Sequence, residues 1–388
     1  MYRRTIEEKV RKALASYRAV ALVGPRQSGK TTLSKMCAET FDYISLENPD
    51  HRSRATEDPR LFLKSCKNST IFDEIQNVPT LFSYLQEVLD DNEDQRKFIL
   101  TGSNSFQLNE KISQSLAGRI RIFNILPLTL EELPDAIRPQ DLDEQMVKGF
   151  YPRIYDHNLE ANEWFASYYQ TYLQKDMKMI LNVSDSNQFD RFVRLCAGRA
   201  GQLGEYASVA NELGISQPTA VRWASVLESS FVTFRLSPHF RNFNKRIIKT
   251  PKIYFYDTGL LCQLLRINSA SILETHPMRG AIFENFIVSE VAKTFFSHGQ
   301  ESPLYFWRDK HGHEIDLLID LGVSLACLEI KSGSTYQKEW EKNIRWFGKL
   351  SHEKDLSLVY GGDDNFDKDN LVVLNWQKIS SFVRDRMG

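Results

Sequence analysis

Residues 24–31 read Gly24-Pro25-Arg26-Gln27-Ser28-Gly29-Lys30-Thr31, and this stretch decides the fold of the first part of the chain. It matches the pattern G-x-x-x-x-G-K-[ST] of a phosphate-binding loop, or P-loop. The apolar run Ala19–Val23 precedes it and the helical stretch Thr32–Ala38 follows it, which is the context that the motif requires. Its glycines let the backbone curl so that N–H groups point at phosphates, and the helix N-terminus adds its dipole.

The residue types in this loop predict ATP and Mg²⁺ as ligands. We expect Lys30 to reach the β- and γ-phosphates and the Thr31 hydroxyl to ligate Mg²⁺. The residues predicted to bind the nucleotide are Gly24, Pro25, Arg26, Gln27, Ser28, Gly29, Lys30, Thr31, Thr32 and Ser103.

A second apolar run ends in two acids, in Ser69-Thr70-Ile71-Phe72-Asp73-Glu74. A strand of a parallel sheet would place both carboxylates at the carboxyl edge, beside the P-loop, where open α/β sheets bind ligands. Asp73 is predicted to hold the Mg²⁺ of ATP, usually through water. Glu74 is predicted to orient and deprotonate the attacking water.

The next expected strand, Phe98–Thr101, also ends in small polar residues. Thr101, Ser103 or Asn104 could hydrogen-bond the γ-phosphate or the water, although a plain turn would look the same. Arg119 and Arg121 stand before the last expected strand of this region. One of them could be an arginine finger for a neighbouring subunit, because the hydrolysis transition state carries charge; solvated surface arginines explain them equally well.

Length and composition bound the remaining choices. At 388 residues the chain can hold two or three domains, and 42% hydrophobic with 26% charged residues is ordinary for a globular protein. A net charge of −1 argues against a wholly basic nucleic-acid coat protein. The five cysteines are scattered, and no stretch approaches the ~20 apolar residues of a membrane span, so we expect a reduced cytoplasmic protein.

Periodicity predicts three domains, at residues 1–145, 146–275 and 276–388. The first alternates strands (Ala19–Val23, Tyr43–Leu46, Ser69–Phe72, Phe98–Thr101, Ile120–Ile125) with helices, which is typical of a parallel sheet covered by helices. From Asn162 to about Leu265 the chain is expected to be helical, with one β-like interruption at Phe231–Leu236. A polar linker at 266–280 leads to an amphipathic helix, Ala281–Phe296, and further strands.

The middle region contains a predicted helix-turn-helix. Tyr206–Leu213 and Gln217–Leu227 are joined by Gly214-Ile215-Ser216, with Gly214 suited to the turn and Ser216 to the N-cap. The segment between Glu228 and Asp257 holds no acidic residue. Its bases, interleaved with Phe240 and Phe243, are Arg235, Arg241, Lys245, Arg246, Lys249 and Lys252.

Two interpretations of this basic segment are open. It could contact the phosphate backbone and unstacked bases of DNA. Alternatively, the helix-turn-helix and the strand expected at Phe231–Leu236 could form a winged helix that packs against another domain. Its basic wing would then face acids of that domain.

Two acids and a lysine are expected to converge in the last region. Glu329 and Lys331 are two residues apart on an expected strand, so their side chains share one face. Asp316 lies on the preceding strand, and the turn between the strands has hairpin length. Such a set suits Mg²⁺-assisted phosphodiester cleavage, with Asp316 and Glu329 as metal ligands and Lys331 positioning or deprotonating a water. A surface hairpin with alternating charges is the structural alternative.

The chain resembles AAA+-type P-loop ATPases, in particular a prokaryotic group. The resemblance spans nearly the whole chain and rests on the P-loop with Thr32-Leu33, Phe72-Asp73-Glu74-Ile75-Gln76, Leu100–Ser103, Leu116–Arg119, Gly149–Pro152 and Gly280–Asn285. It implies an α/β protein with a P-loop ATPase parallel sheet, a helical winged-helix middle domain and a restriction-endonuclease-like, or PD-(D/E)xK nuclease-like, C-terminal domain. It also implies Glu284 as a further metal ligand. No clear lid arginine is present, which puts ring formation in doubt.

The functions that follow are an ATP-hydrolysing enzyme acting on nucleic acid, or a nucleotide-gated regulatory ATPase whose C-terminal domain is an inactive binding module. A protein-remodelling chaperone is a third hypothesis, but the sequence has no recognisable pore loop to support it. ATP is the expected partner, no membrane partner is expected, and DNA and a homo-oligomer remain open.

Overall fold

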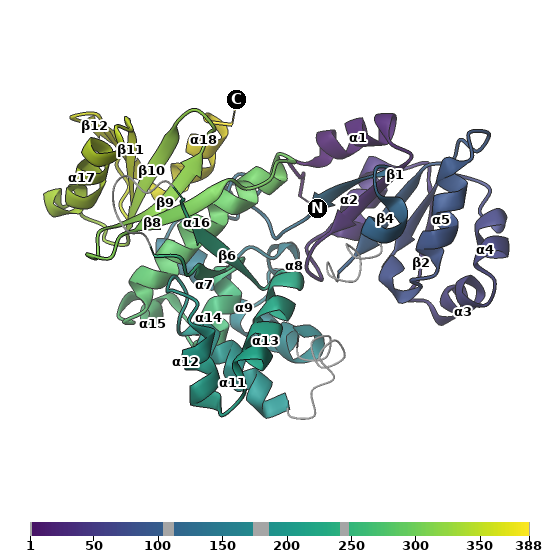
Figure 1. Cartoon of the computed structure of the whole chain (residues 1–388), viewed down its shortest axis with the longest axis horizontal. Coiled ribbons are helices and arrows are strands. Elements are labelled where there is room, and N and C mark those ends of the chain that lie inside the picture. The colour runs from purple at the N-terminus through teal and green to yellow at the C-terminus, as the bar shows by residue number, and fades with distance from the viewer. Residues whose placement is uncertain (1, 104–111, 174–185, 241–247, 388) are drawn as a thin grey trace. The chain divides into compact units, whose positions relative to one another are not determined.

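The computed structural model describes residues 2–103, 112–173, 186–240 and 248–387, and the chain divides into two compact units. Unit 1 comprises Met1–Pro127, Ser229–Phe231 and Phe296–Gln300, and unit 2 comprises the remainder, from Leu128 onward. Figure 1 follows the chain from purple to yellow. The predicted division into three domains stays a prediction.

Unit 1 alternates helices and strands along the chain. Its described elements are α1 (Glu7–Ser16), β1 (Ala19–Val23), α2 (Lys30–Cys37), β2 (Asp42–Ser45), α3 (Pro49–Glu57), α4 (Pro59–Ser65), β3 (Thr70–Asp73), the 3₁₀ turn η1 (Ile75–Asn77), α5 (Leu81–Asp90), β4 (Phe98–Gly102), the π-helical turn η2 (Ile112–Leu116) and β5 (Ile120–Asn124).

The five strands of unit 1 form one parallel sheet in the order β2-β3-β4-β1-β5. All five lie within a residue or two of the ranges expected from the sequence, so the predicted parallel α/β sheet is confirmed. Because the strands are parallel, their carboxyl ends meet at one edge. The P-loop, Asp73–Glu74 and Gly102–Ser103 therefore share that edge.

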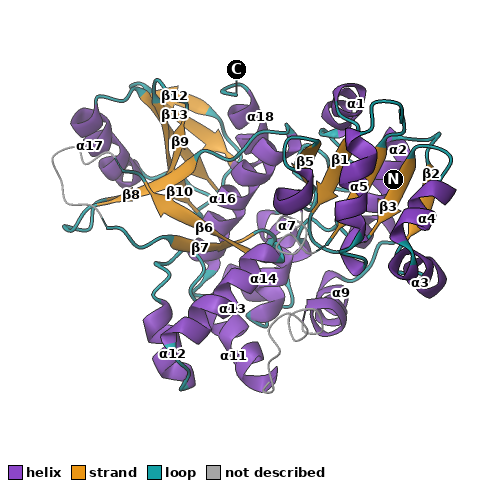
Figure 2. Cartoon of the chain, turned by 45° about the vertical axis from the view of Figure 1, so that its right-hand side comes forward, coloured by secondary structure: helices purple, strands orange, loops and turns teal. Residues whose placement is uncertain are grey.

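Helices α1 and α2 cover one face of this sheet beside β1 (Figure 2), and α4 packs on the other. Val20, Leu22 and Ile71 are buried on the face covered by α1 and α2. Alternate residues of a strand point to opposite faces, so Phe72 lies on the other side. There it stacks on Phe98 at 5.9 Å between ring centres and meets Phe62 of α4 at 6.0 Å.

Unit 2 is helical first and then mixed. Its described elements are α7 (Leu142–Lys148), α8 (Pro152–Asp156), α9 (Ala161–Tyr168), η3 (Tyr169–Leu173), α11 (Ser186–Ala197), α12 (Tyr206–Leu213), α13 (Gln217–Ser229), β6 (Thr233–Pro238), β7 (Lys252–Phe255), α14 (Thr258–Leu264), α15 (Ala270–Glu274), α16 (Arg279–Ser297), β8 (Leu304–Arg308), β9 (Glu314–Asp320), β10 (Leu325–Lys331), η4 (Lys338–Trp340), α17 (Glu341–Ser351), β11 (Asp355–Tyr360), β12 (Phe366–Lys368), β13 (Leu371–Asn375), η5 (Trp376–Lys378) and α18 (Ile379–Arg384).

The unit 2 sheet has the strand order β12-β13-β11-β10-β9-β8-β6-β7. Strands β8, β9 and β10 are antiparallel neighbours, whereas β11 runs parallel to β10 and β13 parallel to β11. Helix α17 packs on this sheet through Ile344 and Phe347, which are buried against strand residues such as Leu318 and Leu358. The helix expected at Ala281–Phe296 is α16, but the expected amphipathic character is wrong, because polar residues such as Asn285, Glu290 and Lys293 are buried along with its apolar ones.

Two elements differ from the expectations. The middle region contains a second strand, β7, which pairs antiparallel with β6, from Thr233 opposite Phe255 to Leu236 opposite Lys252. The segment 266–280, expected to be a polar linker, contains the short helix α15, whose N-cap Ser269 accepts from the N–H of Ile272. None of the helices in the described ranges combines the length and the apolar character needed to cross a membrane.

Candidate functional site

The loop between β1 and α2 has the backbone that only glycine permits at two positions. A Cβ on Gly24 would lie 2.0 Å from the carbonyl oxygen of Ile125, far inside contact distance. Gly29, which caps α2, has φ of 95°, in the left-handed region that favours glycine. The loop therefore curls tightly against the segment after β5, and α2 begins at Lys30.

The Lys30 side chain folds into the concave side of this loop. Its Nζ donates to the carbonyl oxygens of Gly24 at 2.9 Å and Pro25 at 2.7 Å, and the residue is only 4% exposed. Burial lowers the pKa of the Lys30 ammonium, while the charges of Glu74 and Asp73 act in the opposite direction. The Lys30 ammonium therefore lies within the loop that is predicted to bind phosphate.

Other loop residues present polar atoms there. The side-chain oxygens of Gln27 and Ser28 are buried and make no hydrogen bond within the described part of the chain. Buried polar atoms without a partner are rare in native structures. Arg26 lies 3.2 Å from Glu47, and Thr32 is exposed on the first turn of α2.

Asp73 is surrounded by three hydroxyl groups. Thr31 donates to its Oδ1 at 2.8 Å, Thr101 donates to the same oxygen at 2.5 Å, and Tyr43 donates to Oδ2 at 2.8 Å. The structure thus places the two predicted Mg²⁺ ligands of the P-loop site, Thr31 and Asp73, in direct contact. A hydroxyl and a carboxylate are hard oxygen donors and fit Mg²⁺. Sequence reasoning did not single out Tyr43.

Glu74 is held in one orientation by its neighbours. Its φ of 55° is left-handed, and its carboxylate accepts from the Ser103 hydroxyl at 2.8 Å, the Ser103 N–H at 3.2 Å and the Gln76 amide. Its own N–H donates to Thr101 Oγ1 at 3.1 Å. Burial raises the pKa of Glu74, but the Lys30 charge and the bonds from Gln76 and Ser103 outweigh it and leave the pKa below the ordinary value.

These contacts assign partners to the predicted strand-end residues. Thr101 bonds to Asp73 and Ser103 bonds to Glu74, so in the structure both orient the acids. Asn104 lies outside the described residues. Arg119 pairs with Asp90 at 2.5 Å, and Arg121 donates to the carbonyl of Gly299 at 3.3 Å. The arginine-finger role stays a prediction.

Unit 2 brings together the second predicted set of residues. Lys331 Nζ lies 2.7 Å from Glu329 Oε1 and 3.7 Å from Asp316 Oδ2. Asp316 Oδ2 also accepts from the Ile330 N–H at 2.8 Å. Burial raises the pKa of Glu329 to about 8, with the Asp316 charge adding to it, and Glu329 Oε2 makes no hydrogen bond to any described residue. The metal-binding and catalytic roles of this set stay predictions.

Glu284, the further predicted ligand, is already engaged. Its Oε1 accepts from Lys252 at 2.8 Å and from the Tyr254 hydroxyl at 2.5 Å. Lys252 is 3% exposed and also lies 2.5 Å from Glu314. Burial works to lower the pKa of Lys252, but Glu284 and Glu314 outweigh it and raise the pKa above its ordinary value. Within the described ranges, no three His, Cys, Asp or Glu side chains are arranged to hold a metal ion.

The predicted helix-turn-helix residues lie as the sequence suggested. Helices α12 and α13 are joined through Gly214, whose φ is 68°, and Ser216 Oγ accepts from the Thr219 N–H at 3.2 Å. Trp223 of α13 is buried against Phe189 and Phe192. This tryptophan therefore belongs to the core of the helical region.

The basic segment after α13 has more than one environment. Arg235 pairs with Glu228 at 2.9 Å, Lys249 is exposed, and Lys252 is buried among acids. Phe240 is 79% exposed. The predicted DNA-contacting residues Arg241, Phe243, Lys245 and Arg246 lie outside the described residues.

Three family descriptions match successive parts of the chain. Residues 16–134 match an "AAA domain". Residues 139–271 match a domain of unknown function, DUF8612, and residues 279–379 match another, DUF4143. The first match covers the P-loop, Asp73, Glu74 and Ser103.

Known proteins resemble the chain over most of its length. The uncharacterized proteins Rv2008c of Mycobacterium tuberculosis and Mb2031c of Mycobacterium bovis are each 32% identical to it over 378 residues, covering 96% of this chain and 82% of theirs. A solved Walker-type ATPase of Pyrococcus abyssi, PABY2304, aligns at a TM-score of 0.38 with 14% identity, covering 67% of this chain and 94% of that one. The chain belongs to the family of these two mycobacterial proteins, and its residues 16–134 form an AAA-type P-loop ATPase domain.

Proposed function

We propose that the protein binds ATP with Mg²⁺ and hydrolyses it at the carboxyl edge of the unit 1 sheet. The observation that carries this proposal is the continuous hydrogen-bonded set under the P-loop, in which Thr31 and Thr101 bond to Asp73 and Ser103 bonds to Glu74. Motif residues from three strand ends meet there with the buried Lys30 cation.

Each residue has a distinct task in this mechanism. Lys30 and the loop N–H groups bind the β- and γ-phosphates, and the Thr31 hydroxyl and Asp73 hold Mg²⁺, which when bound neutralises charge on the phosphates. Glu74, whose pKa lies below its ordinary value, is ionised at neutral pH and accepts the proton of the attacking water. Ser103 and Gln76 hold the carboxylate in place.

Two variants separate binding from chemistry. Lys30→Ala should reduce both ATP affinity and turnover by orders of magnitude, because it removes the cation placed at the phosphates. Glu74→Gln should retain affinity and lose turnover, because an amide cannot accept the proton. Lys12→Ala is the control, since Lys12 is an exposed lysine of α1 paired with Glu8.

The same measurements distinguish an ATP-hydrolysing enzyme from a nucleotide-gated regulatory ATPase. Near-wild-type hydrolysis by Lys30→Ala would show that the P-loop assignment is wrong. Tight nucleotide retention with little turnover in the wild-type protein would favour the nucleotide-gated regulatory ATPase. ATP turnover stimulated by DNA would instead favour an enzyme acting on nucleic acid, and light scattering with and without ATP would test a homo-oligomer.

A second candidate activity, Mg²⁺-dependent phosphodiester cleavage, is supported by the convergence of Asp316, Glu329 and Lys331 in unit 2. The buried, unpaired Glu329 Oε2 and the Asp316 carboxylate are oxygen donors that would hold the metal, which supplies a polarised phosphate and an acidified water. Glu284 would contribute only after leaving Lys252 and Tyr254.

Cleavage of DNA with Mg²⁺ or Mn²⁺ tests this activity directly. Asp316→Asn should abolish cleavage and spare ATP hydrolysis. Asp320→Asn, at the far end of the same strand, should affect neither reaction. If the wild-type protein cleaves nothing with either metal ion, Asp316, Glu329 and Lys331 do not form a nuclease site. Loss of DNA binding in Asp316→Asn would then point to a binding module in the C-terminal region.

A further inference from the structure

Arg4 lies ahead of α1 and reaches the back of the P-loop. It is 7% exposed. Its Nη1 donates to the carbonyl oxygen of Ser28 at 2.8 Å, and its Nη2 donates to the carbonyl oxygen of Leu126 at 2.9 Å. One guanidinium therefore joins the phosphate-binding loop to the segment Ile125–Pro127, through which the chain leaves β5.

The same segment also touches the other end of the loop. Gly24 packs directly on the Ile125 carbonyl, and the Ile125 N–H donates to Val23 at 2.6 Å. The exit segment thus supports the first residue of the P-loop by backbone contact and its fifth residue, Ser28, through Arg4. Because both ends of the P-loop contact the exit segment, a change in the conformation of the loop is expected to change that of the segment.

The Arg4 bond also orients an N–H group of the loop. The peptide between Ser28 and Gly29 is planar and trans, so its C=O and N–H point in opposite directions. Arg4 holds the carbonyl toward itself, and the Gly29 N–H must then point to the other side of the peptide. Arginine suits this task because its rigid fork presents two donors at fixed spacing, whereas a lysine ammonium is a point charge.

The residues that follow the exit segment belong to unit 2 and are bound there. Within unit 2, the carbonyl of Leu128 accepts from Lys293 at 2.8 Å, and the Leu130 N–H donates to Glu290 at 2.6 Å. Lys293 and Glu290 form a fully buried ion pair at 2.8 Å.

We propose that Arg4 is a positioning residue of the ATP site, which orders the Ser28–Gly29 peptide for phosphate binding and links the P-loop to the exit segment Ile125–Pro127. This role rests on the proposed ATP-binding function. It predicts that nucleotide binding changes the protection of the exit segment, and that the change requires Arg4.

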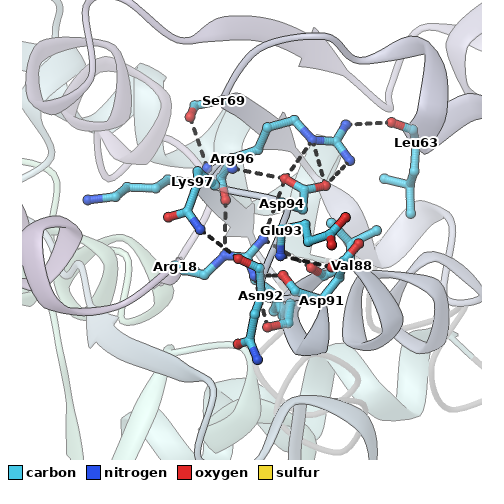
Figure 3. Close-up of polar contacts among 12 residues, drawn as sticks. Arg18, Leu63, Ser69, Val88, Asp91, Asn92, Glu93, Asp94, Arg96 and Lys97 are labelled. Atoms are coloured by element: carbon cyan, nitrogen blue, oxygen red, sulfur yellow. Dashed lines mark hydrogen bonds and ion pairs between the residues drawn. The ribbon is translucent and has the colours of Figure 1, made fainter.

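A matched arginine on the opposite edge of the same sheet provides the control. Arg18 precedes β1 and donates to the backbone carbonyls of Val88, Leu89 and Asp91 at 2.8–3.0 Å, as part of the polar network drawn in Figure 3. Removing either arginine deprives backbone carbonyls of donors, but only Arg4 contacts the P-loop. A loss of ATP affinity shared by the Arg4 and Arg18 variants would reflect a general loss of stability.

The experiment compares Arg4→Met, Arg4→Lys and Arg18→Met with the wild-type protein. Affinity for a fluorescent ATP analogue with Mg²⁺, KM and kcat for ATP, and the thermal midpoint without nucleotide are measured for each. Arg4→Met should weaken affinity and raise KM about tenfold or more, with a smaller change in kcat because Lys30 and Glu74 remain. The affinity of Arg4→Lys should lie between those of Arg4→Met and the wild-type protein. Arg18→Met should keep the wild-type affinity although its thermal midpoint falls about as much as that of Arg4→Met.

Hydrogen exchange gives the second readout. ATP should protect the peptide spanning β5 and Ile125 in the wild-type protein and in Arg18→Met, and this protection should disappear in Arg4→Met and Arg4→Lys. Equal affinities for the Arg4 and Arg18 variants, or unchanged protection in Arg4→Lys, would overturn the proposed role. If the wild-type protein and Lys30→Ala bind the analogue equally, the ATP site itself is misassigned, and the Arg4 role falls with it.

Discussion

Lys252 is a single buried cation that neutralises carboxylates from two other elements of unit 2. It comes from β7 and contacts Glu284 of α16 and Glu314 of β9. Burial raises the pKa of Glu284 above its ordinary value, while Lys252 acts to lower it. Removing Lys252 leaves Glu284 without its cation, whereas Glu314 keeps Arg308 at 3.3 Å. A buried charge without a partner costs far more than the loss of an exposed pair.

We therefore expect Lys252→Met to lower the free energy of unfolding by about 3–5 kcal/mol in denaturant titrations at pH 7. Lys249→Met, an exposed lysine nearby, should change it by less than about 0.5 kcal/mol. The double variant Lys252→Met/Glu284→Gln should recover part of the loss. An unfolding midpoint for Lys252→Met equal to that of the wild-type protein would contradict this account.

Thr101 serves both acids of the ATP site with one hydroxyl. It donates to Asp73 at 2.5 Å and accepts from the Glu74 N–H at 3.1 Å. Thr101→Val keeps the shape and removes both bonds, so we expect a loss of about 1–3 kcal/mol in unfolding free energy. ATP turnover should fall as well, because Asp73 and Glu74 lose their orientation.

The control for this variant is Thr70→Val. Thr70 is equally buried, but its hydroxyl donates to Asn68 at the amino edge of the sheet. It should lose stability while keeping the wild-type kcat. If the two variants have the same kcat, Thr101 has a structural role alone.

At the scale of an element, helix α17 is fixed at its first residue by the buried Glu341. Its carboxylate accepts from Tyr336, from Arg345 and from Lys368, the last at 3.1 Å. Arg345 also donates to the carbonyls of Lys368 and Asp369, so one cluster ties α17 to the β12–β13 hairpin. Burial raises the pKa of Glu341, but these donors outweigh it and lower the pKa to about 2.

A lowered pKa in the folded state gives a definite direction of pH dependence. The stabilisation is present above the unfolded value of 4.5 and is lost as the pH falls toward about 2. Glu341→Gln should therefore cost up to about 3 kcal/mol of unfolding free energy at pH 7 and progressively less at pH values below about 4. Urea titrations at several pH values measure this difference.

Glu339→Gln is the matched control, because Glu339 is exposed on the preceding turn. It should show little difference from the wild-type protein at any pH. A Glu341→Gln penalty that is the same at pH 3 and pH 7 would mean that packing, not charge, carries the contribution of this residue.

At the scale of the whole molecule, DNA binding remains the prediction on which the nucleic-acid function depends. Changing Arg241, Lys245 and Arg246 together to Ala should weaken DNA binding and reduce the slope of log affinity against log salt by up to about 3, through lost phosphate contacts. Lys252 does not belong in this set, because it is buried among acids. The measurement is a titration of DNA at several stated salt concentrations.

The control is a triple Ala variant of the exposed lysines 338, 342 and 349 around α17, which removes the same charge elsewhere. If both triple variants reduce the slope equally, binding reflects net charge alone. An unchanged slope in the first variant would assign the segment after β6 to packing.

The P-loop, the acidic strand end and the parallel sheet of unit 1 could all be predicted from the sequence. These features are local, because the strand, the loop and the start of the helix follow one another within about a dozen residues. Their order and spacing can therefore be recognised directly in the sequence. The convergence of Glu329 and Lys331 was also predictable, since alternate residues of one strand share a face. The AAA domain was recognisable from the same motif residues.

The hydrogen-bond and ion-pair partners of these residues could not be predicted from the sequence. Tyr43 reaches Asp73, Arg4 reaches Ser28 and Leu126, and Lys252 reaches Glu284 and Glu314. Strand β7 was missed for a related reason, because a four-residue strand becomes one only by pairing with β6. Each of these contacts joins residues distant in the chain, and no local spacing encodes which side chains the packed sheets and helices bring within hydrogen-bond reach.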